Sequence, residues 1–317
     1  MKNIINNSNS TINKKLIIFK KLLESGFTFN PTDNTQFIFI CGANGKNGKV
    51  SKRRHNVINF IEKNISDTKC IVAEKVFDIF RVENNKDNIL EIENEISIFT
   101  DYIIIILESP SAFTELGAFC TKELREKLII INNSEFDSAP SFINLGPLKA
   151  LKDEIKSNRV ITYKMNKDGI ENTDAIGSIY NNIFEILNEE KVHKFNIFLK
   201  KDNFDPSKKT SKEALKFVHD VIKITEPVTR SELIEIMKIL FGKNNYNKIT
   251  HYLALLVAFD AIKQNGNYYI SNRKNMYLKY LEKTDSLSIS FKNSYLKYNK
   301  ERLYELQRKD YKRFIHQ

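Results

Sequence analysis

The sequence predicts an α/β protein in which a doubly wound parallel sheet is followed by a smaller domain of helices and one β-hairpin. Short apolar runs, such as Phe37–Cys41 and Tyr102–Ile106, alternate with segments of helical periodicity up to about Glu190. Beyond that point the alternation stops. Several helical segments then precede Asn265-Gly266, a dipeptide that strongly favours a hairpin turn between two strands.

These patterns divide the chain into three parts. We assign residues 1–35 to an N-terminal helix and extension, 36–192 to the α/β domain, and 207–317 to the smaller domain with its C-terminal helix. Residues 1 to about 10 are predicted to be a frayed polar tail, and Thr11–Ser25 a helix that stops at Gly26. Residues 200–206 are predicted to be a linker.

Within the α/β domain, each predicted strand is an apolar run and each predicted helix repeats its apolar residues every three or four positions. In order, the predicted elements are a strand at Phe37–Cys41, a strand at Cys70–Ala73, a helix at Ile89–Phe99, the central strand from Tyr102, a helix to about Arg125, strands at Lys127–Ile131 and Arg159–Tyr163, and a closing helix at Thr173–Leu187. Such alternation is typical of a parallel sheet with helices on both faces.

The central stretch, Tyr102–Leu124, carries the candidate chemistry. Ser109 is a good N-cap and Pro110 fits the first helical position, so a strand, a tight turn and a helix bracket two carboxylates, Glu108 and Glu115. Ligands bind at the carboxyl edge of such sheets. The helix dipole is expected to favour the charged form of a carboxylate early in this helix.

The loop after the first strand contains Gly42, Gly45 and Gly48, spaced three residues apart. This spacing matches neither the dinucleotide-binding nor the Walker glycine pattern. Two interpretations stay open: backbone N–H groups that approach a phosphate or ribose, and an ordinary strand-to-helix loop.

In the smaller domain we predict a helix from Glu213, a second that starts at Thr229–Glu232 and runs to Leu240, a third at Tyr246–Ile262, the hairpin, and a last helix at Phe291–Phe314. Helices and a hairpin in this order are the parts of a winged helix-turn-helix domain. Candidate contacts to nucleic acid or to a protein partner are Lys248 and His251 on the third helix and Lys263, Arg273 and Lys274 around the hairpin. The third helix is markedly apolar, so both kinds of partner stay open.

Charge and cysteine content narrow the function further. The formal net charge is +11, and residues from Lys201 onward hold 23 Lys+Arg against 13 Asp+Glu, which leaves 27 against 26 before them. This asymmetry favours a nucleic-acid or acidic partner for the C-terminal part, or else a Lys-rich solvated surface. Three scattered cysteines, no metal-binding motif, and no signal peptide or apolar membrane span indicate a cytoplasmic protein without a metal site.

Three strings resemble the effector proteins of bacterial retrons: FICG (Phe39–Gly42), ESPSAFTELGAF (Glu108–Phe119) and SFINLGP (Ser141–Pro147). In those effectors a nucleoside deoxyribosyltransferase-like domain of Rossmann type precedes a winged-helix domain. The resemblance also implies family positions at Arg54, Glu74, Phe77, Asp78, Glu93 and Asp101, all of them polar except Phe77.

The resemblance implies that Glu115 attacks the anomeric carbon of a ribosyl-type sugar or stabilises its oxocarbenium form. The implied substrate-binding residues are Gly42, Arg54, Glu74, Asp78, Glu108, Ser109, Ser111 and Thr114. The transferases carry an Asp and a Gly-Thr pair where this chain has Glu108 and Ala112-Phe113-Thr114. This difference favours hydrolysis of another N-ribosyl bond, with NAD as the expected substrate, over base exchange between nucleosides.

The resemblance further implies a toxic effector of an antiphage system, held silent by the retron reverse transcriptase and its RNA–DNA hybrid. It also implies a homo-oligomer or higher assembly, with no cofactor beyond the substrate and no membrane attachment. The alternative is a non-catalytic nucleotide-sensing or DNA-binding winged-helix regulator.

Overall fold

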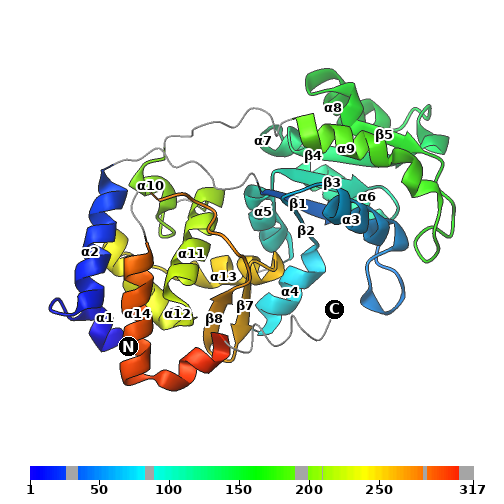
Figure 1. The fold of residues 1–317 in the computed structure, drawn as a ribbon. Helices are drawn as coiled ribbons and strands as arrows, with labels where there is room; N and C mark the ends of the chain where they lie inside the picture. The colour runs from blue at the N-terminus through cyan, green and yellow to red at the C-terminus, as the bar shows by residue number, and fades with distance from the viewer. Residues whose placement is uncertain (26–34, 83–88, 190–198, 209, 281–283, 307–317) are drawn as a thin grey trace. The chain divides into compact units, whose positions relative to one another are not determined.

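The computed structural model describes residues 1–25, 35–82, 89–189, 199–208, 210–280 and 284–306 (Figure 1). The chain forms two compact units. One comprises Asn34–Lys194, and the other combines Met1–Asp33 with Phe195–Gln317. The N-terminal helices therefore belong to the same unit as the C-terminal part of the chain.

The first-named unit, Asn34–Lys194, is built on a five-stranded sheet, which confirms the predicted α/β class with a parallel sheet. Its strands are β1 (Gln36–Cys41), β2 (Thr68–Ile71), β3 (Tyr102–Ile106), β4 (Leu128–Asn133) and β5 (Val160–Tyr163), in the order β2-β1-β3-β4-β5. All neighbouring strands are parallel. The direction of winding reverses between β1 and β3, the position where such sheets place their ligand sites.

Helices cover both faces of this sheet. They are α3 (Lys52–Asn64), α4 (Ala73–Val82), α5 (Ile89–Phe99), α6 (Pro110–Phe119), α7 (Lys122–Arg125), α8 (Lys149–Glu154) and α9 (Tyr180–Glu189). Side chains of α3 and α9 share one buried cluster with Ile38 and Ile40 of β1. On the opposite face, Phe39 packs edge-on against Phe119 of α6, with ring centroids 5.9 Å apart. Successive β1 residues thus serve different helix layers.

The predicted closing helix at Thr173–Leu187 starts differently from the prediction. It begins as a 3-10 segment, Ala175–Ile179, and continues as α9. The Asp174 side chain caps this segment by accepting the Ile176 N–H. Further short segments are Lys46–Gly48, Ser134–Phe136 and Ser157–Arg159, all 3-10, and the π-helical Asn144–Leu148.

The start of α6 confirms the predicted cap. The Ser109 hydroxyl accepts the N–H of Ala112, and Pro110 is the first helical residue. All five residues of β3 are buried, as expected for a strand covered on both faces. At the other end of β3, the Asp101 carboxylate accepts the Phe37 N–H at 2.8 Å and ties β3 to β1.

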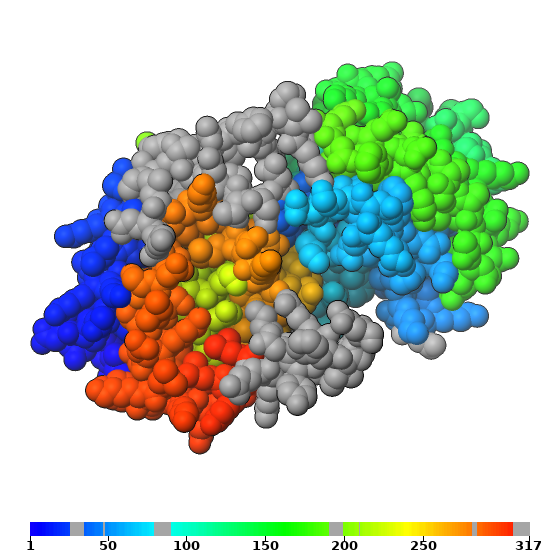
Figure 2. All heavy atoms as spheres, in the orientation of Figure 1, coloured from blue at the N-terminus to red at the C-terminus, as the bar shows by residue number. Residues whose placement is uncertain are grey.

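The second unit is mainly helical. It contains α1 (Lys2–Asn6), α2 (Thr11–Glu24), α10 (Lys201–Phe204), α11 (Lys212–Thr225), α12 (Arg230–Phe241), α13 (Ile249–Ala258) and α14 (Asp285–Tyr298), with the 3-10 segment Lys300–Leu303. Strands β6 (Val228–Thr229), β7 (Ile262–Asn265) and β8 (Tyr268–Ser271) form an antiparallel sheet in the order β6-β8-β7. Helix α2 packs against α12 and α14. In Figure 2 the orange atoms of α14 lie beside the blue atoms of α2.

The hairpin and the cap of the second predicted helix are confirmed in this unit. Strands β7 and β8 pair around Gly266, whose φ of +55° suits glycine at a tight turn. Thr229 and Glu232 form a reciprocal capping box at the start of α12. The predicted helices and hairpin occur in the expected order, with β6 as an unforeseen third strand; their assignment to the winged-helix fold stays a prediction.

Two segments predicted to be irregular are helical instead. The predicted N-terminal tail contains α1, whose Ile5 is buried and which contacts α12. The predicted linker contains α10, because Phe204 is buried and packs on Phe217 of α11 with ring centroids 5.4 Å apart. In both cases one apolar side chain with a partner distant in sequence outweighs the polar composition.

Two predicted helices also have different bounds. The third helix is shorter than Tyr246–Ile262, because Ile262 pairs in β7. The last helix begins at Asp285 rather than Phe291 and ends at Tyr298. The end predicted for it, like the predicted stop at Gly26, lies outside the described residues. Within the described ranges, no helix is both long and apolar enough to cross a membrane.

Candidate functional site

Three helices on one face of the sheet each contribute a glutamate to a single cluster. Glu74 lies on α4, Glu93 on α5 and Glu115 on α6, and each interacts electrostatically with at least one of the others. Helices α4 and α5 contact β1, and α6 contacts β3. The cluster therefore gathers beside β1 and β3, the two strands between which the winding reverses. We call these three residues the carboxylate cluster.

Glu115 is the least satisfied member of the carboxylate cluster. Its Oε2 is buried and accepts no hydrogen bond from any described residue. Burial, and next the negative charge of Glu93, raise the pKa of Glu115 to about 8, although Arg54 opposes the shift. The pKa of Glu115 thus shifts in the direction opposite to the one expected from the helix dipole, and the largest cause of the shift is the loss of hydration.

Glu93 has a similar environment. Its side chain is buried on α5, and burial together with the charge of Glu74 raises its pKa to about 7. Two neighbouring carboxyl groups whose pKa values lie near or above 7 release their protons as a pair rather than independently. Near neutral pH the pair retains at least part of a proton. Such a pair can supply a carboxylate and an acid at one place.

Glu74 differs from Glu93 and Glu115, because its pairing with Arg54 lowers its pKa. The buried Arg54 guanidinium donates to both oxygens of Glu74, at 2.8 and 3.0 Å, and also to the carbonyl oxygen of Ile40 at 3.0 Å. Burial alone would raise the pKa of Glu74, but the hydrogen bonds and charge of Arg54 lower it overall. Glu74 is thus a fixed carboxylate, and its charge helps to keep the proton on Glu93.

Gly42 allows Arg54 to reach this position. A Cβ atom at Gly42 would lie 2.9 Å from Arg54 Cδ and 2.9 Å from an oxygen of Glu108. No larger residue fits without moving both side chains. Gly42 therefore lets the Arg54 and Glu108 side chains pack closely against the backbone after β1, a role that requires no contact with a substrate.

Glu108 is fully engaged within the protein. Its side chain is completely buried, and it accepts hydrogen bonds from the Ala43 N–H at 3.0 Å, from the Ser51 hydroxyl, and from Arg53 Nη1 at 3.0 Å. Arg53 continues to Asp174, with Nε 2.7 Å from Oδ2. This network joins the loops that follow β1, β3 and β5. Glu108 thus shapes the edge of the sheet and presents no free oxygen to a ligand.

Only part of this network is indicated by local sequence patterns. Ser51 precedes the basic helix start and caps α3, and Arg53 adjoins Arg54 in sequence. Adjacent residues on a helix point in different directions, so the two arginines serve different carboxylates. Asp174 had no local signal, because its partner lies more than a hundred residues away.

The glycine-containing loop uses its own N–H groups. Those of Ala43, Gly45 and Lys46 donate to Glu108, to the Lys49 carbonyl and to Glu171, respectively. Three donors that a phosphate would need are therefore already engaged. Of the two interpretations left open, the structure favours an ordinary, internally bonded loop.

The remaining predicted substrate contacts lie toward solvent. Ser111 and Thr114 are exposed on α6; the Ser109 and Ser111 hydroxyls are 2.9 Å apart, and Thr114 donates to the Pro110 carbonyl at 3.1 Å. Asp78 is exposed on α4, one turn beyond Glu74. The structure shows no hydrogen bond from these residues to Glu115. Their contact with a substrate stays a prediction.

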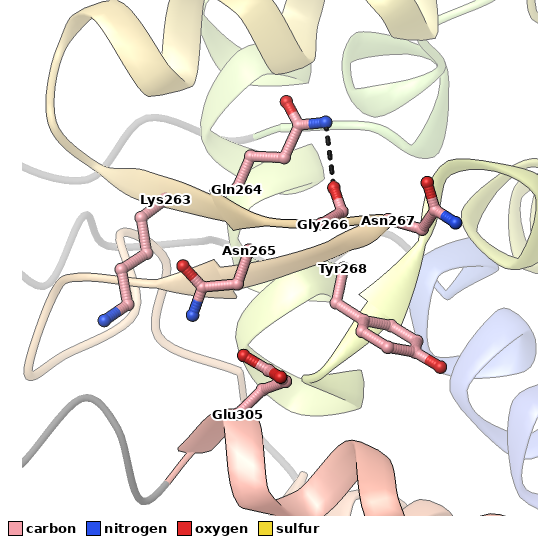
Figure 3. A pocket seen from close by; sticks show the side chains of 7 residues that line it. All are labelled: Lys263, Gln264, Asn265, Gly266, Asn267, Tyr268 and Glu305. Carbon is pink, nitrogen blue, oxygen red and sulfur yellow. Dashed lines mark hydrogen bonds between the residues drawn. The ribbon is translucent and has the colours of Figure 1, made fainter.

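The predicted partner contacts occupy three places in the second unit. Lys248 directly precedes α13, which carries His251. Lys263 lies on β7 and, with Asn265, Tyr268 and Glu305, lines a hollow beside the hairpin (Figure 3). Arg273 and Lys274 follow β8, and the Arg273 guanidinium lies 3.9 Å from the centre of the Tyr277 ring.

The two units differ in charge more strongly than the sequence alone suggested. Asn34–Lys194 contains 21 Lys+Arg and 24 Asp+Glu, a net charge of −3. Subtraction from the chain totals of 50 and 39 leaves 29 basic and 15 acidic residues, a net charge of +14, for the other unit. The N-terminal helices contribute five basic residues and one acidic residue to that unit.

Among the residues whose positions are described, no group of three or more His, Cys, Asp or Glu side chains has the arrangement of a metal site. Cys41, at the end of β1, is buried beside the carboxylate cluster. Burial, and then the charges of Glu115 and Glu93, raise the pKa of its thiol well above the usual value, so Cys41 is a core residue rather than a nucleophile.

Comparison with known proteins identifies the family. Residues 50–264 match the family described as "STM3845 retron effector protein". The chain is 38% identical over 300 residues to the Escherichia coli "Retron Ec73 putative ribosyltransferase/DNA-binding protein", which covers 92% of this chain and 95% of that relative. A second E. coli relative, "Retron Ec86 putative ribosyltransferase/DNA-binding protein", is 40% identical over 116 residues, 36% of this chain and 37% of the relative. The chain therefore belongs to the retron effector family.

Proposed function

We propose that this retron effector cleaves an N-glycosidic bond, that its substrate is NAD, and that Glu115 is the residue that meets the anomeric carbon. The observation that carries the proposal is the buried, unpartnered Oε2 of Glu115 beside a second carboxyl group of raised pKa. A buried carboxylate oxygen without a partner, next to a second carboxyl group of raised pKa at the ligand-binding edge of the sheet, favours a functional site. The names of the two relatives include ribosyltransferase, which agrees with chemistry at a ribosyl carbon.

The proposed reaction has two steps. The Glu115 carboxylate forms a bond to C1′ of the nicotinamide ribose while the bond from C1′ to the pyridinium nitrogen breaks, and its electron pair leaves with neutral nicotinamide. Water then attacks C1′, the ester bond between C1′ and Glu115 breaks to release ADP-ribose and restore the Glu115 carboxylate, and the proton of the water passes to a carboxylate of the pair. Alternatively, Glu115 stabilises the oxocarbenium ion without bonding to it, and water attacks directly.

The raised pKa of Glu115 favours a cationic substrate. An isolated buried carboxylate is costly to ionise, but a pyridinium cation beside it offsets that cost. Nicotinamide also leaves as a neutral molecule and needs no protonation. A purine nucleoside supplies no such charge and needs an acid for its base, a role that protonated Glu93 would take.

We further propose that the basic unit contacts the retron reverse transcriptase and its RNA–DNA hybrid, and that this contact holds the toxic activity in check during normal growth. A net charge of +14 supports binding to a nucleic-acid backbone, which requires no sequence readout. Lys248, His251, Lys263, Arg273 and Lys274 stay the proposed contacts.

A direct test is chromatography of the small molecules formed when the purified chain, alone and with its reverse transcriptase and hybrid, is incubated with NAD or with purine nucleosides. Nicotinamide release by the wild type and its loss in Glu115→Gln are expected, with a decrease of about 10³-fold or more. Glu126→Gln, a change of the same kind at an exposed carboxylate, is the matched control and should retain activity.

Each outcome has a different meaning. Free base from nucleosides with no nicotinamide from NAD would keep the glycosidic chemistry but overturn the choice of substrate. Cleavage that persists in Glu115→Gln would overturn the role of Glu115. If nothing is cleaved in any sample, and the chain binds duplex DNA in a sequence-dependent way at moderate salt, the regulator described as the alternative would replace the enzyme.

A further inference from the structure

The hollow beside the hairpin of the basic unit has the size of a ligand site. Its volume is about 750 Å³, inside the range of about 300–1,000 Å³ that is usual for small-molecule sites. Its walls come from β7, β8 and residues 304–306, all in the basic unit (Figure 3). The side chains that line it are half-buried or exposed, so a group from solvent can enter. The proposed cleavage of NAD leaves this hollow without a role.

Three side chains of different chemistry meet in the hollow. Asn265 and Tyr268 pair across β7 and β8, so their side chains lie on the same face of the hairpin. The Glu305 carboxylate lies on that side as well (Figure 3). Gln264 points to the opposite side, as alternation along a strand requires, and donates to the Gly266 carbonyl at 3.1 Å. The hollow thus combines an amide, an aromatic ring and a carboxylate.

Buried contacts hold the ring and the carboxylate in place. The Arg302 guanidinium lies over the Tyr268 ring, 4.8 Å from its centre. Arg302 is only 4% exposed, and it donates to the two oxygens of Glu232 at 2.9 and 3.1 Å. Since Glu305 follows Arg302 by three residues, this ion pair also anchors the segment that carries the carboxylate. The opposite face of the ring is the one that can stack on a ligand, and a pre-organised site loses less entropy on binding.

We propose that this hollow binds a guanine base, unpaired in a single strand of nucleic acid. Guanine carries two adjacent donors, N1–H and the N2 amino group, and the Glu305 carboxylate accepts a hydrogen bond from each. Adenine and cytosine present one donor beside one acceptor on this edge, and thymine and uracil a single N–H, so each gives a carboxylate at most one hydrogen bond. The Asn265 amide donates to guanine O6, and the base stacks on Tyr268.

Charge favours a strand of nucleic acid over a free base as the source of the guanine. Lys263 also lines the hollow, and its ammonium group suits a backbone phosphate next to the bound base. The net charge of +14 attracts the polyanion to this unit. The inference rests on the proposed contact between the basic unit and nucleic acid. It adds a base preference, which backbone contacts do not provide.

The test is fluorescence anisotropy of the full chain with labelled single strands of about twelve thymidines, in which the central position holds guanine, adenine, cytosine or thymine. We expect the guanine strand to bind about tenfold more tightly than the other three. Glu305→Gln retains one acceptor and should bring the four strands close to equal affinity. Glu301→Gln removes the same charge at an exposed carboxylate of the same segment and, as the matched control, should keep the preference.

Two further measurements need no variant. A strand with 6-thioguanine at its centre should form a photo-cross-link to a wild-type peptide that contains Asn265 or Tyr268. GMP, added as a competitor, identifies the source of the base. If GMP displaces the labelled strand only at concentrations far above those of the unlabelled guanine strand, the single strand is supported. Displacement at equal concentrations would overturn that part and assign the hollow to free guanine nucleotides.

The outcomes separate this inference from the proposals on which it builds. Equal affinity of the wild type for all four strands, or a guanine preference that persists in folded Glu305→Gln, would overturn the inference and leave the proposed nucleic-acid contact intact. A wild type that binds no strand and no GMP would overturn both. Anisotropy does not depend on enzymatic activity, so each of these results is independent of the NAD experiment.

Discussion

A buried polar cluster in the basic unit and the carboxylate cluster in the α/β unit differ in how completely their hydrogen-bonding groups are satisfied. In the basic unit, His219 lies between Asp220 and Ser271, with Nδ1 2.9 Å from Asp220 Oδ1 and Nε2 3.0 Å from Ser271 Oγ. Asp220 also accepts the backbone N–H groups of Tyr277 and Leu278 and the hydroxyl of Tyr280. Glu115, in contrast, keeps a buried oxygen without a partner.

The comparison shows why residue types alone do not identify a site. A serine, a histidine and an aspartate in this order have the contacts of a hydrolase triad. Here all three are fully buried, and each oxygen of Asp220 accepts two hydrogen bonds, so no substrate can reach the serine and no acceptor is spare. Burial lowers the pKa of His219 despite Asp220, which keeps the ring neutral. This cluster stabilises the fold, whereas the carboxylate cluster contains a buried oxygen, Glu115 Oε2, that lacks a hydrogen-bond donor.

The largest predicted effect is the loss of the satisfied cluster. Asp220→Ala leaves two backbone N–H groups, the Tyr280 hydroxyl and His219 without their acceptor in a dry interior. We expect the free energy of unfolding to fall by about 3 kcal/mol or more, measured by urea denaturation. Asp285→Ala, at an exposed carboxylate on α14, is the control. A loss below about 1 kcal/mol would contradict the role given to Asp220.

In the carboxylate cluster we expect the opposite effect on stability: Glu115→Gln should raise the free energy of unfolding at high pH. The pKa of Glu115 is about 8 in the folded chain and near 4.3 in an unfolded one. Because the folded chain binds this proton more tightly, wild-type stability is fully present below about pH 4 and falls as the pH rises through about 8. Glu115→Gln imitates the protonated form and removes that loss. The full pKa difference corresponds to about 5 kcal/mol, but Glu115 is only partly buried and solvent screens its charge, so we expect a stabilisation of about 1–2 kcal/mol near pH 9.

The measurement is urea unfolding near pH 5 and near pH 9, where the stabilisation should be small and large, respectively. Exposed Glu126→Gln should show no such pH dependence. Equal effects of Glu115→Gln at both pH values would mean that the proton does not reside on Glu115.

The sequence predicted most of the α/β unit, because its elements are specified locally. Residues in β3 are apolar without interruption, and Ser109-Pro110 marks the start of α6 within two residues. Helix α10 escaped prediction because its reason for existing, the contact between Phe204 and Phe217, joins residues 13 positions apart across an apparent linker. Contacts of this kind leave no periodic signal in the sequence.

The sequence points to candidate site residues, but it does not predict their environment. The strings around Glu108 and Glu115 drew attention to both residues, yet one is enclosed by three donors and the other has none for one of its oxygens. The difference depends on Ser51 and Arg53, on α3, and on the helices that bury Glu115. Solvation and charge at a site are properties of the assembled elements, so a local motif does not encode them.

A smaller effect is expected from a change at Ser271, which contacts His219 on the side opposite Asp220. Ser271→Ala removes the hydrogen bond to His219 Nε2 and the hydroxyl that accepts the Arg273 N–H at 3.1 Å. We expect a stability loss of about 1 kcal/mol and unchanged cleavage of NAD. Thermal unfolding and the chromatographic assay measure the two. Loss of cleavage in a folded Ser271→Ala protein would place the chemistry at His219, Asp220 and Ser271 and not in the carboxylate cluster.

The smallest and most specific effect concerns the coupling inside the carboxylate cluster. Glu93→Gln removes the second-largest cause of the raised pKa of Glu115 and leaves the largest, burial, in place. The pKa of Glu115 should therefore fall by roughly half a unit to one unit, and the rising limb of the pH–rate profile for NAD cleavage should move to lower pH by that amount. A purely structural role for Glu93 would lower the rate at every pH without moving this limb.

The exposed variant Glu126→Gln provides the reference profile, since it removes the same charge away from the cluster. A limb that stays in place in Glu93→Gln would mean that the two carboxyl groups titrate independently. A limb that moves to higher pH would reverse the sign of the interaction, because removal of a neighbouring negative charge can only ease the ionisation of Glu115. The displacement of the limb in Glu93→Gln therefore measures how strongly Glu93 and Glu115 titrate as a pair.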